Sequence, residues 1–181
     1  MTRRAMRPAR WLIAAVAGLS VSGLAVRASA QSPSYELEGL IAGDEAPRAW
    51  YSARGHIEAD TGNASAALHY FRIHGGWDSK KVRLLYKCDA AGVGVSTDWV
   101  SDWCPASADW QRSQNIRRFS MRLDGPEADQ YDLTYSCWVG KTGHTATDRG
   151  ERLPGEWCGV THSAEQVWVT RITVTLRKKA A

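Results

Sequence analysis

The chain has 181 residues, of which 44% are apolar and 23% charged, and its formal net charge is +4. Five of the 23 basic residues and none of the 19 acidic ones lie in the first 30 residues. The rest therefore carries 18 basic against 19 acidic residues, a net charge of −1. The positive charge belongs to the N-terminal segment, so the composition gives no support for binding of nucleic acid.

Residues 1–30 have the pattern of a cleavable secretory signal. Four arginines precede the apolar run Trp11–Val26, and the small residues Ala28-Ser29-Ala30 follow it. The alternative is an N-terminal membrane anchor, but the run is shorter than the roughly 20 apolar residues that a span needs. We expect a secreted or periplasmic protein with no membrane span after cleavage. The arginines are Arg3, Arg4, Arg7 and Arg10.

After the signal, apolar and polar residues alternate with a period of two, which is typical of strands with one buried face. Turn signals rich in Gly, Asp, Asn and Pro separate these stretches. No amphipathic helix of useful length is indicated. Strands are expected in chain order at 35–41, 49–58, 68–73, 82–88, 118–123, 131–137, 166–170 and 172–176.

One pattern occurs twice. Val82–Cys88 is followed by Asp102-Trp103-Cys104, and Tyr131–Cys137 is followed by Glu156-Trp157-Cys158. Both stretches have Leu, Tyr and Cys at alternate positions, then a loop with Gly, then an acidic residue, Trp and Cys. This order predicts two related units, at about 68–118 and 119–176, within a single domain that spans residues 31–181.

The repeat contains all four cysteines and favours the pairs Cys88–Cys104 and Cys137–Cys158, one per unit. The alternative joins Cys88 to Cys137 and Cys104 to Cys158. Structural disulfides fit an exported protein. The Tyr-x-Cys motif resembles the tyrosine corner of immunoglobulin-like domains, as an analogy of architecture only. We therefore predict an all-β, disulfide-stapled antiparallel β-sandwich, or small barrel, built from two related units.

The sequence lacks the common catalytic and metal-binding motifs. It has no Gly-x-Ser-x-Gly, no His-Glu-x-x-His, no phosphate-binding loop and no Cys-x-x-Cys pair. We therefore predict no catalytic residue, no metal ligand and no cofactor.

Three Asp-Trp pairs occur within 13 residues, and Trp77 and Trp138 lie at other loop edges. An indole face packs against the C–H face of a sugar, and a nearby carboxylate accepts hydrogen bonds from its hydroxyls. The predicted ligand-binding residues are Asp98, Trp99, Asp102, Asp109, Trp110, Trp77 and Trp138. Trp103 and Trp157 adjoin cysteines, so we expect them to pack in the core.

These features predict an exported, non-catalytic binding module for carbohydrate or another cell-surface ligand. The alternative is an inhibitor or partner of a secreted enzyme, which would be bound through the loops at 89–103 and 138–157. A second alternative is a glycan hydrolase, which needs only two suitably placed carboxyl groups.

Overall fold

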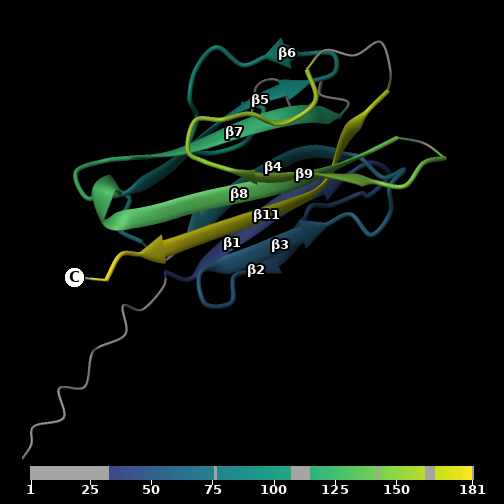
Figure 1. Ribbon diagram of the computed structural model, residues 1–181. Coiled ribbons are helices and arrows are strands. Elements are labelled where there is room, and N and C mark those ends of the chain that lie inside the picture. The colour runs from purple at the N-terminus through teal and green to yellow at the C-terminus, as the bar shows by residue number, and fades with distance from the viewer. Residues whose placement is uncertain (1–32, 76, 107–114, 142, 162–165, 181) are drawn as a thin grey trace, which may run out of the picture.

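A computed structural model describes residues 33–75, 77–106, 115–141, 143–161 and 166–180 (Figure 1). The predicted signal segment, residues 1–30, lies outside them. The described chain is all-β, as expected. The strands are β1 (Tyr35–Ile41), β2 (Arg48–Tyr51), β3 (His56–Asp60), β4 (Leu68–Gly75), β5 (Arg83–Ala90), β6 (Gly94–Val95), β7 (Ile116–Asp124), β8 (Tyr131–Gly140), β9 (Thr147–Arg152), β10 (Cys158–Gly159) and β11 (Trp168–Lys178).

The described part of the chain has one short 3-10 helix, Ala128–Gln130, between β7 and β8. No helix in these residues has the length and apolar content that a bilayer crossing requires.

The strands form three antiparallel sheets. Sheet I has the order β2-β1-β4, sheet II the order β10-β7-β5-β6, and sheet III the order β3-β11-β8-β9. The predicted antiparallel pairing is therefore confirmed. The two-layer sandwich is not confirmed, because the strands are divided among three sheets.

The three sheets share one plan of connection. Each has a central pair made by the first and last strands of one chain segment: β1 with β4, β5 with β7, and β8 with β11. Each also receives backbone from another segment. Sheet III receives β3, sheet II receives β10, and sheet I receives a single bridge from Cys104 to Phe71 of β4. The exchange is cyclic and ties every segment to another sheet.

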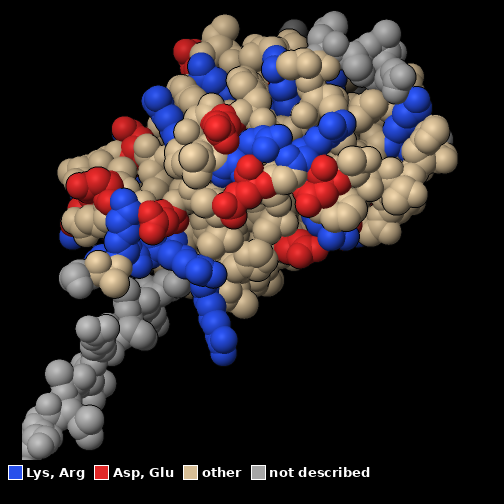
Figure 2. All heavy atoms as spheres, viewed as in Figure 1, with Lys and Arg blue, Asp and Glu red and all other residues tan. Residues whose placement is uncertain are grey.

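Figure 2 shows that acidic and basic side chains are interspersed over β8, β9 and β11. Arg171 on β11 lies 3.2 Å from Glu58 and also pairs with Asp60, both on β3. Lys179 lies 3.6 Å from Asp132 on β8. This face therefore carries mixed charge, in keeping with the near-zero charge of the chain after residue 30.

The core lies between the sheets, where the inward positions of the strands meet. Phe71 of sheet I has its ring centroid 5.4 Å from that of Tyr86 and 5.5 Å from that of Phe119, both on sheet II. Phe119 lies 5.7 Å from Tyr135 of sheet III. This chain of fully buried rings joins all three sheets, and the contacts add specificity to the hydrophobic burial.

Buried tyrosine hydroxyls cross from sheet to sheet. The hydroxyl of Tyr86 on β5 accepts a hydrogen bond from the Ile73 N–H of β4 at 3.2 Å and donates one to the Asp102 carbonyl. The Tyr86 hydroxyl thus satisfies one backbone N–H of sheet I and one backbone carbonyl of the loop before Cys104. These groups would be costly to bury unpaired.

Tyr135 on β8 repeats this arrangement. Its hydroxyl accepts a hydrogen bond from the Met121 N–H of β7 at 3.1 Å and donates one to the Glu156 carbonyl. The Tyr35 hydroxyl on β1 donates a hydrogen bond to the Val174 carbonyl of β11 at 2.8 Å. Each sheet is therefore linked to the next by a tyrosine.

Both favoured disulfides are confirmed: Cys88–Cys104 and Cys137–Cys158, with no free cysteine among the described residues. The first joins β5 to the segment that bridges β4, and the second joins β8 to β10. Each therefore links two sheets. Two disulfides indicate an oxidising, extracytoplasmic environment.

The single strand predicted at 49–58 is wrong. Two strands occupy this stretch, β2 beside β1 and β3 beside β11. Between them the chain turns at Arg54 and Gly55, whose φ angles are 53° and 74°. These left-handed conformations reverse the chain, so an alternating stretch is divided between two sheets.

The C-terminal strands predicted at 166–170 and 172–176 are one strand, β11, with an irregularity between Val169 and Arg171. The extra residue shifts the alternation of buried and exposed side chains. The sequence therefore predicts two strands where the backbone forms one. Strand β9 was not predicted, because its edge position leaves it largely exposed and without apolar alternation.

Candidate functional site

A cleft of about 260 Å³ opens where β4 ends and β5 begins. Ile73 and Leu84 supply apolar surface, while the turn after β4 and the loop before Cys104 supply polar groups. The other side chains that line it are His74, Trp77, Ser79, Arg83 and Ser101. The cleft therefore combines one indole with donors and acceptors of different charge.

Gly75 allows Trp77 to lie against the end of β4. A Cβ atom at Gly75 would lie 2.5 Å from the Trp77 ring and 2.6 Å from Tyr35. The Trp77 ring centroid lies 5.9 Å from that of Tyr35, and its side chain is half-buried. The absence of a side chain at position 75 thus makes room for an aromatic wall of the cleft.

Beside the cleft, the outer face of sheet I holds a cluster of charged and titratable groups. The strand register places Glu36 opposite His74, and Glu38 opposite Arg72. Arg72 Nε lies 2.7 Å from Glu38 Oε2, and His74 Nε2 lies 3.4 Å from Glu38 Oε1 and 4.0 Å from Glu36 Oε2. Asp102 lies 3.6 Å from Arg72.

The hydrogen bond from Arg72 lowers the pKa of Glu38 and outweighs partial burial, which acts to raise it. The same hydrogen bond raises the pKa of Arg72. Glu38 is therefore a carboxylate at neutral pH, suited to accept hydrogen bonds or bind a cation rather than to donate a proton.

Two of the predicted ligand-binding residues lie at this site. Trp77 lines the cleft. Asp102 lies 3.6 Å from Arg72, in the charged cluster beside the cleft. Ser101, the neighbour of Asp102, lines the cleft as well. The predicted Asp-Trp segment, residues 98–110, thus contributes to the site through residues 101 and 102.

Two other predicted residues lie elsewhere. Trp138 lines a smaller cleft of about 170 Å³, together with Asp60 and Arg171. Trp99 lies on the outer face of sheet II, with the Arg122 guanidinium 4.5 Å and the Lys87 ammonium 5.3 Å from its ring centroid.

Asp98 is exposed next to Trp99. Asp109 and Trp110 lie outside the described residues. The predicted set therefore does not form one surface over the part of the chain that the structure describes.

Trp103 and Trp157 are half-buried beside their cysteines, and each has a guanidinium over its ring. Arg72 lies 4.3 Å from the Trp103 centroid, and Arg118 lies 4.5 Å from the Trp157 centroid. These cation–π contacts occupy ring faces and stabilise the loops. The main role of Trp103 and Trp157 is therefore to stabilise the loops and not to stack on a ligand.

Sequence reasoning missed Glu36, Glu38 and Arg72. Their only signal is alternation: all three fall on the polar side of predicted strands. Which polar residues face each other depends on the pairing of β1 with β4, and these strands are separated in sequence by β2 and β3.

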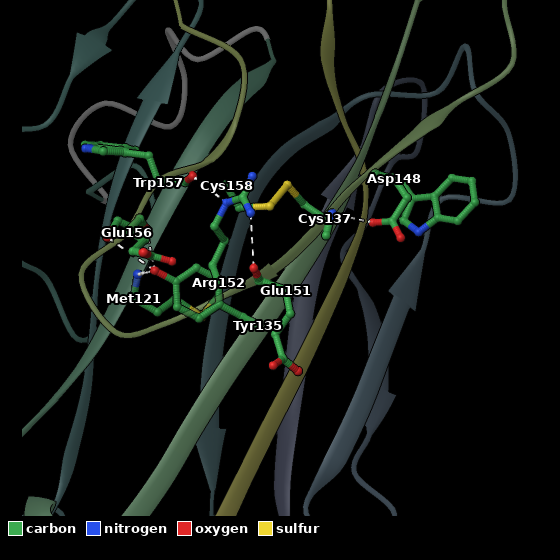
Figure 3. Close-up of a disulfide and its surroundings, with 12 residues drawn as sticks. Met121, Tyr135, Cys137, Asp148, Glu151, Arg152, Glu156, Trp157 and Cys158 are labelled. Atoms are coloured by element: carbon green, nitrogen blue, oxygen red, sulfur yellow. Dashed lines mark hydrogen bonds between the residues drawn. A yellow bond between two sulfur atoms is a disulfide. The ribbon is translucent and has the colours of Figure 1, made fainter.

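The second disulfide lies next to a hydrogen-bonded turn at residues 152–157 (Figure 3). Leu153 N–H donates to Glu156 Oε2 at 2.8 Å, and Arg152 Nε donates to the Trp157 carbonyl at 3.1 Å. Gly155 N–H donates to the Met121 carbonyl at 2.7 Å. The Leu153 side chain is 59% exposed at this turn.

Comparison of the chain with models of protein families, with curated proteins and with solved structures finds no match.

Proposed function

We propose that this protein is an exported, non-catalytic binding module that recognises carbohydrate, or another polar cell-surface ligand, in the cleft beside Trp77. The composition of the cleft carries the proposal: a half-buried indole stands next to an imidazole, a guanidinium and hydroxyl groups. An indole packs on the apolar face of a pyranose, while the polar neighbours hydrogen-bond its hydroxyls.

The cleft wall is held rigid, which lowers the entropic cost of binding. Ser101 lies in the loop closed by the disulfide Cys88–Cys104. On one side of it, Val100 and Tyr86 exchange backbone hydrogen bonds of 3.0 and 2.8 Å, and on the other the Asp102 carbonyl accepts the Tyr86 hydroxyl.

A glycan array with the disulfide-bonded chain tests the proposal. For a glycan that binds, Trp77→Ala is expected to weaken affinity about tenfold, the equivalent of roughly 1.4 kcal/mol. Ser101→Tyr places a bulky side chain in the cleft from an exposed position and is expected to abolish the signal.

Trp138→Ala is the matched control, because it removes an indole from the other cleft. Trp99→Ala tests whether the ligand extends onto sheet II. Near-UV circular dichroism reports whether each variant stays folded. Unchanged glycan binding in both Trp77→Ala and Ser101→Tyr would rule out this cleft.

A second candidate function is the binding of a secreted protein, such as an enzyme that this chain would inhibit. The exposed Leu153 on its hydrogen-bonded turn supports it, as does the 49% exposed Val95 in the other disulfide-closed loop. A stable partner in co-purification that Leu153→Asp releases, together with no glycan signal, would favour this function.

The glycan hydrolase alternative stays a prediction. Glu38 is a poor general acid, because the Arg72 hydrogen bond lowers its pKa. Analysis of the array glycans for cleavage products after incubation tests the alternative directly.

The proposed export depends on removal of residues 1–30. N-terminal sequencing of the secreted or periplasmic protein is expected to begin at Gln31. Recovery of the full-length chain in the membrane fraction would instead identify residues 1–30 as an anchor.

We further propose that the chain is a small barrel built from related units, and that a third unit precedes the two with cysteines. Strand register supports it. Gly39 pairs with Phe71 as Cys88 pairs with Phe119, and Ala59 pairs with Ile172 as Cys158 pairs with Phe119.

Gly39 and Ala59 would then hold the positions of a disulfide in the first unit. The double substitution Gly39→Cys with Ala59→Cys tests this equivalence. It is combined with Leu68→Ala, because a Cβ at position 39 would lie 2.9 Å from the Leu68 side chain. A disulfide between positions 39 and 59, detected by peptide mass mapping, supports the equivalence. Two free thiols in the folded variant would contradict it.

A further inference from the structure

Three potential metal ligands converge on the outer face of sheet I. One carboxylate oxygen each from Glu36 and Glu38 and a ring nitrogen of His74 lie within 4.8 Å of one another. We propose that these three side chains bind a transition-metal ion of the zinc type. One imidazole nitrogen with two carboxylates is a donor set that zinc accepts, with coordination positions left over.

Two of the separations between ligand atoms are close to those that such an ion requires. Zinc binds nitrogen and carboxylate oxygen at about 2.0–2.2 Å, so neighbouring ligands in a tetrahedral site lie about 3.4 Å apart. His74 Nε2 lies 3.4 Å from Glu38 Oε1 and 4.0 Å from Glu36 Oε2. The three ligand atoms lie within 4.8 Å of one another, so side-chain rotations that move them by up to about 1.4 Å would complete the geometry.

The local charge favours a cation. Glu36, Glu38 and Asp102 contribute three negative charges around Arg72, the nearby permanent cation. With Arg72 the formal charge of these groups is −2, which a divalent ion would balance. Both glutamates are 23% exposed and His74 is 49% exposed, so an ion from solvent has access.

Arg72 also orients one ligand. It binds Oε2 of Glu38 at 2.7 Å, which leaves Oε1 directed toward His74. Carboxylates that bind metal ions are typically held in place by hydrogen bonds of this kind. Because His74 also lines the cleft, the free coordination positions of the ion would lie beside the ligand cleft.

Titration of the untagged, disulfide-bonded chain with ZnCl₂ in a calorimeter tests the site without any glycan, so its outcome is independent of the proposed function. At about pH 7.5, one saturable site is expected. His74→Gln and Glu36→Gln are each expected to weaken zinc binding by at least about tenfold.

His56→Gln is the matched control. His56 is exposed on β3 two residues before Glu58, and its Nδ1 lies 3.0 Å from the Thr175 hydroxyl. It thus offers an exposed histidine that belongs to no group of three potential metal ligands among the described residues, and its variant is expected to bind zinc like the parent chain. Thermal unfolding midpoints show whether each variant keeps its stability.

Absence of saturable zinc binding would overturn the proposal. Equal loss of binding in His56→Gln and His74→Gln would also overturn it, because the titration would then report surface histidines in general. Retained binding in both Glu36→Gln and His74→Gln would show that the ion binds elsewhere.

Discussion

The first four strands and the rest of the chain make similar pairings by different means. In sheets II and III the first strand is tied to a later part of the chain by a disulfide and by a buried tyrosine. The tyrosine is Tyr86 in sheet II and Tyr135 in sheet III. In sheet I the positions in the same register are Leu37 and Gly39, which offer neither a hydroxyl nor a sulfur atom.

Sheet I is held instead by packing and by Tyr35. Leu37 is fully buried, and Tyr35 makes its hydrogen bond to β11 from two residues earlier in the strand. The comparison indicates that this pairing of strands forms without a disulfide or a hydroxyl at these positions, while cross-links add stability to particular segments. Sheet I contributes His74 to the cleft, and the region with the disulfides contributes Arg83 and Ser101, so the candidate binding groups come from both regions.

The largest expected effect is loss of a disulfide. Cys88→Ala with Cys104→Ala, and Cys137→Ala with Cys158→Ala, are each expected to lower the free energy of unfolding by about 3 kcal/mol, because each bond closes a loop of similar length. Urea unfolding under oxidising conditions measures the change. A loss below about 1 kcal/mol in either variant would contradict the cross-linking role assigned to that bond.

The next effect concerns the tyrosine hydroxyls. Tyr86→Phe and Tyr135→Phe each remove the hydroxyl that hydrogen-bonds a buried backbone N–H and a partly buried carbonyl, so each is expected to cost about 2 kcal/mol. Urea unfolding gives the comparison. Tyr51→Phe is the control, because Tyr51 is 72% exposed and its change is expected to stay within about 0.5 kcal/mol. Losses of this small size at Tyr86 and Tyr135 would show that the two hydroxyls are dispensable.

A smaller effect is expected at Gly39. Gly39→Ala places a Cβ 2.9 Å from the Leu68 side chain and 3.2 Å from the Tyr70 carbonyl, and this crowding is expected to cost about 1 kcal/mol. Thermal unfolding measures it. The same change in a Leu68→Val background is expected to cost less, and an equal cost in both backgrounds would locate the strain elsewhere.

The smallest effect is a difference in alkaline stability. Burial raises the pKa of Tyr86 and Tyr135 above the ordinary value of 10.0, so the folded chain keeps protons that the unfolded chain loses. The stability contribution is complete below about pH 10 and falls as pH rises above it.

Unfolding midpoints at about pH 8 and about pH 11 check this. The double variant Tyr86→Phe with Tyr135→Phe is expected to lose less stability between these two values than the parent chain. An equal loss would assign the alkaline effect to other groups, among them Tyr35, whose pKa burial also raises.

The sequence by itself determined the strand class and most strand positions, and it favoured the cysteine pairing that the structure has. Period-two alternation reports one buried face of a strand and is a local signal, carried within a few residues. The cysteine pairing was favoured by a pattern that recurs about 50 residues later in the chain. A different signal, the Asp-Trp pairs and the tryptophans at loop edges, placed Trp77 and Asp102 among the candidate binding residues.

Tertiary structure alone decided which sheet each strand joins, and therefore which polar side chains meet. Glu36 and His74 become neighbours because β1 pairs with β4, and Ser101 reaches Trp77 because a disulfide-closed loop passes the end of that sheet. The turn at Arg54 and Gly55 sends β3 to a different sheet from β2. Strand partners are chosen by the packing of the whole core, so alternation shows that a residue faces outward without showing what it faces.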